Sequence, residues 1–278
     1  ELIDGFKQQG RCDFIADFAM KLPITVFMKM VDQPLADLPQ LLEWTEMSVR
    51  PVRPEDRNIA FEQMGRYLTE VIEQRRRNPG NDLLSAVVWA KVDGEPIAMV
   101  DLLSTTINLM FGGLDTVASA LGFAAKYLAE NPAKRQELID HPDYISNAVD
   151  ELLRMFAPSS SARVITRDLT YNGLEFRKGD RIYVRPILHG MDERKFPNPL
   201  EADWQREGLE RNYASFGNGP HRCPGAGLAR SEMRIFLEEW LARIPSFALD
   251  PDRKPRFGTG MVNAVLSLSL VWDPASTR

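Results

Sequence analysis

The most informative run of the sequence is Phe216-Gly217-Asn218-Gly219-Pro220-His221-Arg222-Cys223-Pro224-Gly225. It places one cysteine in a glycine-rich loop, just ahead of a segment whose apolar residues recur at helical spacing. Glycines let the backbone approach a flat ligand where a Cβ would clash. A cysteine at the start of a helix meets the positive end of the helix dipole and free backbone N–H groups, which favour the thiolate. The pattern therefore indicates that Cys223 is a metal ligand or a nucleophile rather than a small cysteine buried in a turn.

Two further patterns lie upstream of this loop. Glu151-Leu152-Leu153-Arg154 places opposite charges three residues apart on a helix, a spacing that by itself predicts a surface ion pair worth under about 0.5 kcal/mol. Gly112-Gly113-Leu114-Asp115-Thr116 places a polar pair after two glycines in an otherwise apolar helix. Either the threonine bonds back to a carbonyl of its own helix, or the pair lines a groove where small polar molecules bind.

Together these patterns resemble a known family. Phe216, Gly219, His221, Cys223 and Gly225 resemble the haem-binding signature of the cytochrome P450 family, the haem-thiolate monooxygenases. The upstream patterns are similar to the family's Glu-x-x-Arg helix and to the oxygen-activating part of its long central helix, in the expected order. The resemblance runs from about residue 13 to the end and is closest to the soluble bacterial camphor-hydroxylating type.

This resemblance implies a fold and a domain organisation. The expected fold is mainly α, with a long central helix and small β-sheets. Residues 1–278 would form a single cytochrome P450 domain that corresponds to the C-terminal two thirds of the family pattern. Family members carry a further segment ahead of Glu1, so we expect the functional molecule to have a further N-terminal region.

The resemblance also implies the cofactor and its contacts. The cofactor would be haem b, iron protoporphyrin IX, with the Cys223 thiolate as the axial ligand of the iron. His221 and Arg163 would bind the two haem propionates, since cationic or donor groups suit carboxylates; without the resemblance, Arg163 is a solvated strand end. The other expected cofactor contacts are Phe216, Gly217, Gly112 and Gly225.

The remaining site residues are carried over in the same way. Thr116 would hydrogen-bond the bound oxygen and Asp115 would relay protons to it. Glu151 and Arg154, with Arg206 as a third member, would have a structural role in holding the cysteine loop. The expected substrate contacts are Asn108, Phe111 and Met261; for Asn108 and Phe111 helix packing is the alternative.

The function implied is hydroxylation of a small apolar, terpenoid-like substrate with O2. Electrons would come from an iron–sulfur ferredoxin and its NAD(P)H-dependent reductase, because no flavin or nicotinamide motif is found in the sequence. A small basic patch of Arg222, Arg230 and Arg234 is the candidate docking site for an acidic electron donor. The alternatives are a peroxide-driven haem-thiolate peroxygenase, or a non-catalytic haem-binding fragment.

Composition is ordinary for a soluble globular protein. Of 278 residues, 44% are hydrophobic and 26% charged, and the net charge of −5 gives no indication of nucleic-acid binding. Two cysteines cannot form a disulfide framework, which suits a reducing cytoplasm. The longest uncharged apolar-rich run covers residues 102–114, whereas a membrane helix needs about 20 residues, so we expect a cytoplasmic protein without a membrane partner.

The pattern of apolar residues predicts the main elements. We expect helices over residues 14–30, with a break at Pro23, and over 61–77, 97–130 and 143–156. Short strands are expected over 164–184, with a hairpin turn at Asn172-Gly173. Leucines alternating with serines over 266–270 predict one last strand.

Overall fold

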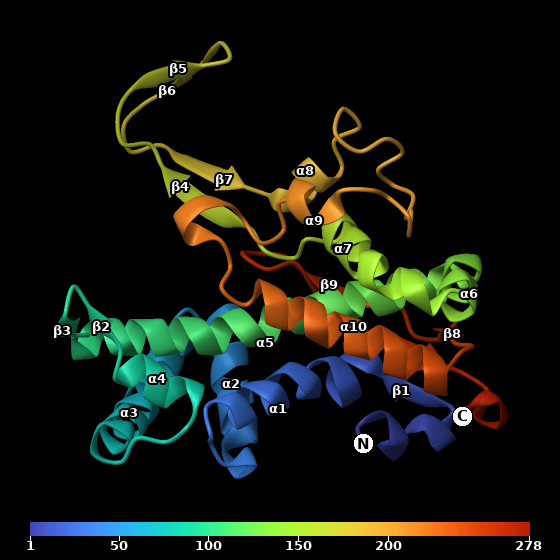
Figure 1. Ribbon diagram of the computed structural model, residues 1–278, viewed down its shortest axis with the longest axis horizontal. Coiled ribbons are helices and arrows are strands. Elements are labelled where there is room, and N and C mark those ends of the chain that lie inside the picture. The colour runs from blue at the N-terminus through green and yellow to red at the C-terminus, as the bar shows by residue number, and fades with distance from the viewer. The chain divides into compact units, whose positions relative to one another are not determined.

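Helices dominate the computed structural model of the chain, and the strands form small sheets (Figure 1). The structure describes residues 1–48, 50–110, 112–113, 115–209 and 211–278. These residues divide into two compact units. The first unit contains residues 1–19 and 116–278, and the second contains residues 20–115. Helix α5 (Met99–Glu130) passes from the second unit into the first.

The second unit is built from helices around one apolar core. Its elements are α1 (Lys21–Met30), a 3₁₀ turn at Leu35–Asp37, α2 (Leu38–Val49), α3 (Asp56–Arg77), α4 (Leu83–Val88), the hairpin strands β2 (Lys91–Val92) and β3 (Glu95–Pro96), and the first half of α5. The core between these helices is apolar, and its most deeply buried members include Ile24, Met28, Met64, Ile72, Leu84 and Leu102. Their helical spacing in the sequence is what directs one face of each helix inward.

The ends of α3 and α4 follow from local chemistry. Helix α3 ends at Arg77, just ahead of Pro79 and Gly80. The Asp82 side chain then accepts a hydrogen bond from the Ser85 amide and caps α4. Asp82 also accepts from the buried Arg75 at 3.1 Å, so a single carboxylate joins the two helices.

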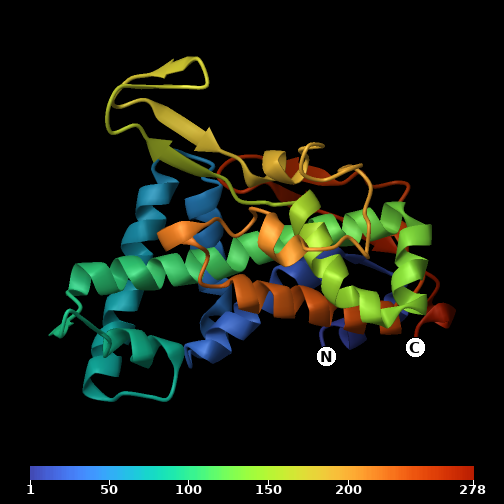
Figure 2. The same ribbon diagram turned by 45° about the horizontal axis from the view of Figure 1, so that its top comes forward.

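The first unit combines helices with all but one of the small sheets in the described chain. Its helices are a π-helical turn (Ile15–Ala19), the second half of α5, α6 (Pro132–Asp140), α7 (Ile145–Met155), α8 (Pro186–Gly190), α9 (Leu209–Asn212) and α10 (Ala226–Arg243), with 3₁₀ turns at Ile3–Gly5, Lys7–Gln9, Pro142–Tyr144, Gly219–His221 and Pro274–Ser276. In both views α10 runs beside the C-terminal half of α5 (Figures 1 and 2). Trp240 on α10 is fully buried, and its ring lies 5.0 Å from that of Phe14.

The strands of the first unit pair antiparallel in short ladders. Strand β11 (Ser269–Val271) lies between β1 (Arg11–Asp13) and β8 (Ala248–Leu249), and the two-stranded ladders pair β9 (Arg256–Gly258) with β10 (Ala264–Ser267), β4 (Ser161–Val164) with β7 (Arg181–Val184), and β5 (Leu169–Tyr171) with β6 (Leu174–Phe176). The predicted hairpin turn is confirmed, since Asn172 and Gly173 both have positive φ, at 51° and 79°.

Two details of the sequence prediction are wrong. Pro23 does not interrupt a helix but lies in the first turn of α1, where its missing N–H would have had no partner within the helix; the break comes earlier, at Met20. The predicted last strand is two strands, because β10 and β11 meet at Leu268 and pair with different partners. Leu268 itself is fully buried, which explains the unbroken alternation in the sequence.

Helix α5 is also the one helix in the described chain that is long and apolar enough to cross a membrane, at 32 residues. More than half of its apolar window is buried inside the protein, and the core helix of a globular protein has the same length and composition. By itself this property is weak support for a membrane span.

Candidate functional site

The cysteine loop leads directly into α10, as the orange segment of Figure 1 shows. Gly217 and Gly219 have φ of 66° and 68°, a conformation that residues with a Cβ rarely adopt. The chain then makes a 3₁₀ turn at Gly219–His221, and the Cys223 amide donates to the Phe216 carbonyl at 2.8 Å. Helix α10 starts three residues later at Ala226, so Cys223 is presented at the start of a helix with its side chain exposed.

The donor groups of the first unit suit haem. Arg163 in β4 and His221 in the cysteine loop are both exposed, and they belong to the same unit as Cys223. No atom lies within 4 Å of the position that a Cβ would take at Gly219, so there is open space next to the loop at this residue. One soft thiolate for iron and two basic groups for carboxylates match the chemistry of iron protoporphyrin IX, so the residues present fit the cofactor.

The Glu-x-x-Arg pair is buried, as the family resemblance implies, and is not the surface pair that the spacing alone predicts. Glu151 and Arg154 on α7 have no exposed surface, and the Arg154 guanidinium donates to both Glu151 oxygens at 2.7 and 2.8 Å. Arg206 donates to the same carboxylate at 3.1 Å. Arg154 also donates to the carbonyls of Gly190 and Pro199. The three charged side chains therefore tie α7 to the segments on either side of residue 200.

Gly190 is a residue that sequence reasoning missed. A Cβ at this position would lie 2.1 Å from the Arg154 carbonyl oxygen, which no side chain tolerates. The close approach of the two backbones is what allows Arg154 to reach the Gly190 carbonyl. Nothing in the local sequence around Gly190 signals this requirement, because the clashing atom comes from a helix that is distant in the chain.

The polar pair of α5 has a partner that the sequence did not reveal. Asp115 is only 4% exposed. Its Oδ1 accepts a hydrogen bond at 2.5 Å from Arg50, which lies in the connection between α2 and α3. In the described part of the chain, its other oxygen, Oδ2, is buried and has no hydrogen-bond partner. Glu46 holds the other side of Arg50 at 2.8 Å. Burial lowers the pKa of Arg50, but the bonds to Asp115 and Glu46 outweigh it and raise the pKa, so Arg50 stays charged.

The other predicted contacts are distributed over both units. Gly112 and Asn108 lie one helical turn apart on α5 in the second unit, and the Asn108 side chain is exposed. Thr116 and Gly225 belong to the first unit, as does Met261, which is 58% exposed. Phe111 lies outside the described residues.

The predicted basic patch is largely neutralised. Arg230 pairs with Asp150 at 2.7 Å, and Arg234 pairs with Glu238 on its own helix, also at 2.7 Å. Only Arg222 among the three residues has no ion pair recorded in the described chain, and it is exposed. Two of the three cations of the predicted docking patch are therefore paired with carboxylates of the protein itself.

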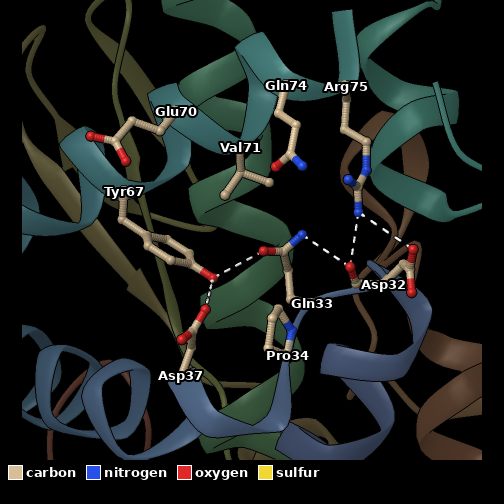
Figure 3. Close-up of a pocket in the computed structure, with 9 residues that line it drawn as sticks. All are labelled: Asp32, Gln33, Pro34, Asp37, Tyr67, Glu70, Val71, Gln74 and Arg75. Atoms are coloured by element: carbon tan, nitrogen blue, oxygen red, sulfur yellow. Dashed lines mark hydrogen bonds and ion pairs between the residues drawn. The ribbon is translucent and has the colours of Figure 1, made fainter. Parts of the chain in front are cut away.

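A pocket of about 440 Å³ lies in the second unit, between α3 and the turn that follows α1 (Figure 3). The Tyr67 hydroxyl lies 2.8 Å from Asp37 Oδ2 and 3.1 Å from Gln33 Oε1, and Arg75 donates to the Asp32 carbonyl at 2.8 Å. The hydrogen-bonding groups of these side chains are therefore bonded within the pocket wall. None of the predicted haem, oxygen or substrate contacts lines this pocket.

The comparisons with known proteins identify the family. The family model described as cytochrome P450 matches residues 20–261. The chain belongs to the cytochrome P450 family. It is 32% identical over 266 residues to the probable cytochrome P450 127A1 of Sinorhizobium fredii, covering 96% of this chain and 64% of that protein. It is 30% identical to the mycinamicin IV hydroxylase/epoxidase of Micromonospora griseorubida, covering 98% and 70%.

The P450 fold is also evident in a solved structure. The crystal structure of CYP101J2 matches with a TM-score of 0.89 and 37% identity, over 98% of this chain and 68% of that one. The mainly α P450 fold expected from the sequence is thereby confirmed, and so is the resemblance to the bacterial type. P450 proteins are haem-thiolate proteins, and their cofactor is haem b. This P450 chain spans between 64% and 70% of the length of the two curated relatives named above.

Glu232 on α10 is a second buried carboxyl group that the sequence did not single out. It is 5% exposed, its Oε2 has no hydrogen-bond partner in the described chain, and burial raises its pKa from 4.5 to about 7. Below pH 4.5 the Glu232 carboxyl is protonated in both the folded and the unfolded protein, so its burial then carries no charge penalty. As the pH rises from 4.5 through about 7, the unfolded state loses the proton first, and the free energy of unfolding falls.

We therefore expect Glu232→Gln to remove a pH dependence of stability. Because burial raises the pKa of Glu232 from 4.5 to about 7, the free energy of unfolding should fall by about 3 kcal/mol between pH 4.5 and 8. The variant should be more stable than the original at pH 8 and similar at pH 5, by urea unfolding. Glu239→Gln on the exposed side of the same helix is the control. Equal pH slopes in the Glu232 variant and the original would contradict this account.

Proposed function

We propose that this P450 chain acts as a haem-thiolate monooxygenase that hydroxylates a small apolar, terpenoid-like substrate with O2. The observation that carries the proposal is the exposed Cys223 thiol at the start of α10, in a loop whose glycines hold the backbone open. Haem held by this thiolate supplies oxygen activation when bound. His221 and Arg163 would orient the cofactor by binding its propionates, and Phe216, Gly217, Gly112 and Gly225 would contact it.

In the proposed reaction, Asp115 and Thr116 take part in proton transfer. Asp115 has one oxygen fixed by Arg50 and a second, buried oxygen available to a proton. A carboxyl group in this setting can take up a proton on the free oxygen and pass it to an acceptor, while Arg50 continues to donate to the other oxygen. Thr116 follows on the same helix, and its hydroxyl would donate to bound oxygen. An acid followed by a threonine favours the monooxygenase over a peroxygenase, which takes its oxygen from peroxide and needs no such relay.

The electron donor and substrate belong to the same proposal. The donor would be an iron–sulfur ferredoxin reduced by an NAD(P)H-dependent reductase, and the protein would work in the cytoplasm without nucleic-acid or membrane partners. The resemblance to the soluble bacterial camphor-hydroxylating type supports this electron supply and substrate class. Asn108, Phe111 and Met261 would contact the substrate.

The proposal is tested by comparing two routes of turnover. With reduced ferredoxin and O2, monoterpenoid substrates should be hydroxylated and should shift the haem spin state on binding. Hydrogen peroxide alone should support much slower turnover. Faster turnover with peroxide than with ferredoxin would favour the peroxygenase, and a preference for long-chain fatty acids would contradict the substrate class.

The Arg50–Asp115 pair gives a prediction of its own. Asp115→Asn keeps the shape of the side chain but cannot release a proton, so oxygen-dependent turnover should fall by about 10²-fold or more. Arg50→Gln should disturb the same step and should also destabilise the protein, because it leaves a buried carboxylate without its cation. Substrate binding, measured by the spin-state shift, should remain in Asp115→Asn.

A control comes from a neighbouring ion pair. Arg53 pairs with Asp56 at 2.7 Å at the start of α3, but Arg53 is mostly exposed. Arg53→Gln should therefore leave turnover within about twofold, since pairs with an exposed partner contribute little. Full activity in Asp115→Asn would mean that protons reach the site by another route.

A further inference from the structure

A closed triangle of polar contacts lies beside the cysteine loop. Arg230, on the second turn of α10, donates to Asp150 Oδ1 at 2.7 Å and to the Tyr213 hydroxyl at 2.7 Å. The Tyr213 hydroxyl donates in turn to the same Asp150 oxygen at 2.6 Å. Burial and the neighbouring Asp150 raise the pKa of Tyr213, so its hydroxyl keeps the proton it donates. Each of the three side chains is therefore hydrogen-bonded to the other two.

The guanidinium of Arg230 also contacts two aromatic rings. Its central carbon lies 5.0 Å from the centre of the Phe216 ring and 5.6 Å from that of Tyr213. A guanidinium at this distance is attracted by the ring electrons, more strongly where water is excluded. Tyr213 is buried and Phe216 partly buried, so the contacts are not those of a solvated surface group.

The triangle joins three segments that meet at the cysteine loop. Asp150 belongs to α7, where it adjoins the buried Glu151; Tyr213 and Phe216 precede the loop; and Arg230 belongs to the helix that follows it. The Phe216 carbonyl accepts the Cys223 amide at 2.8 Å. A group that fixes Phe216 therefore also fixes the backbone of Cys223.

A simple surface ion pair does not account for these contacts. Such pairs contribute about 0–1 kcal/mol and do not need an aromatic ring or a tyrosine hydroxyl. Arg234 and Glu238 on the same helix are an ordinary pair of this kind, at 2.7 Å, with both side chains nearly half exposed. The pair of Arg230 and Asp150 is less exposed, at 26% and 14%.

We propose that Arg230 is a positioning residue for the haem ligand, which holds the Phe216–Cys223 loop in place through Asp150, Tyr213 and the ring of Phe216. The proposal rests on the proposed function only in taking Cys223 as the haem ligand. Arg230 touches neither the thiol nor the reacting atoms in this account. It acts on Cys223 through the Phe216 ring and the hydrogen bond between Phe216 and Cys223.

The test uses the haem-loaded protein and the variants Arg230→Met, Arg230→Lys and Arg234→Met. Hydrogen exchange of the Cys223 amide reports how firmly the loop is held. We expect Arg230→Met to raise that exchange rate by about tenfold or more, since it loses two charge-assisted bonds and the ring contact. The ferrous carbonyl complex should then divide between the red-shifted band of thiolate ligation and an unshifted band. Arg234→Met should leave both readouts unchanged.

The lysine variant separates charge from shape. Lysine keeps the charge but cannot donate in a planar fork to Asp150 and Tyr213 while it stacks on Phe216, so Arg230→Lys should recover less than half of the lost protection. Full recovery would overturn the role of the planar group. Equal exchange in Arg230→Met and Arg234→Met would overturn the proposal as a whole.

A milder variant covers the case in which Arg230→Met does not fold. Tyr213→Phe removes one hydroxyl and keeps the ring, and it should raise the exchange of the Cys223 amide by about fivefold. Unchanged exchange would overturn the proposal. If the original protein shows no thiolate band, the proposed function fails, but the exchange rates still decide whether Arg230 holds the loop.

Discussion

Replacing Cys223 by histidine is expected to abolish the strongly red-shifted Soret band of the ferrous carbonyl complex. The physical reason is that only a thiolate donates enough electron density to the iron, and in this loop Cys223 is the exposed sulfur at the start of α10. Turnover with ferredoxin and O2 should be lost together with the band. Absorption spectra of the reduced protein with and without carbon monoxide are the direct measurement.

The matched control is the other cysteine. Cys12→Ala changes a buried residue of β1, which pairs with Leu270 of β11, and should leave the band in place. It should cost some stability, since a buried side chain is shortened. A red-shifted band that persists in Cys223→His would refute the assignment of the haem ligand.

The second large effect is expected from Glu151→Gln. The Glu151 carboxylate is fully buried and accepts hydrogen bonds from Arg154, Arg206 and the Asp203 amide. The substitution leaves two guanidinium groups facing a neutral amide in the interior. Breaking a buried ion pair by removing one partner costs about 3–5 kcal/mol. The midpoint of urea unfolding should therefore fall strongly.

An exposed pair provides the comparison for this prediction. Lys134 and Glu137 on α6 lie 2.9 Å apart with their side chains partly exposed. Glu137→Gln should change the free energy of unfolding by less than about 1 kcal/mol. If the two glutamine variants lose similar stability, the buried network does not have the structural role assigned to it.

Much of the fold could be predicted from periodicity and turn chemistry. The long helix α5 starts within two residues of the prediction and ends at Glu130, because apolar residues repeat along it and Asn131-Pro132 stops it. The turn at Asn172-Gly173 was predictable because few residues other than asparagine and glycine tolerate positive φ. Helix α3 starts five residues earlier than predicted, because its first turn is polar and has no apolar repeat.

Sequence patterns predicted only those parts of the candidate site that are local in the chain. The cysteine loop and the Asp115-Thr116 pair are short runs whose composition indicates their chemistry. The partners that complete them come from distant parts of the sequence: Arg50 lies 65 residues from Asp115, and Arg230 lies 80 residues from Asp150. A single sequence carries no signal for such pairs, because either arginine taken alone has the pattern of an ordinary surface residue.

The different burial of the two cysteines has a practical consequence. Cys12 is 8% exposed, and burial followed by the charges of Asp17 and Asp13 raises its thiol pKa far above the ordinary value, so it stays protonated and unreactive. Cys223 is exposed. The unmodified chain thus offers a single addressable sulfur at the start of α10. A maleimide dye would label that one position without any engineered cysteine. In its proposed role as haem ligand, the same sulfur would be protected from the dye once haem is bound.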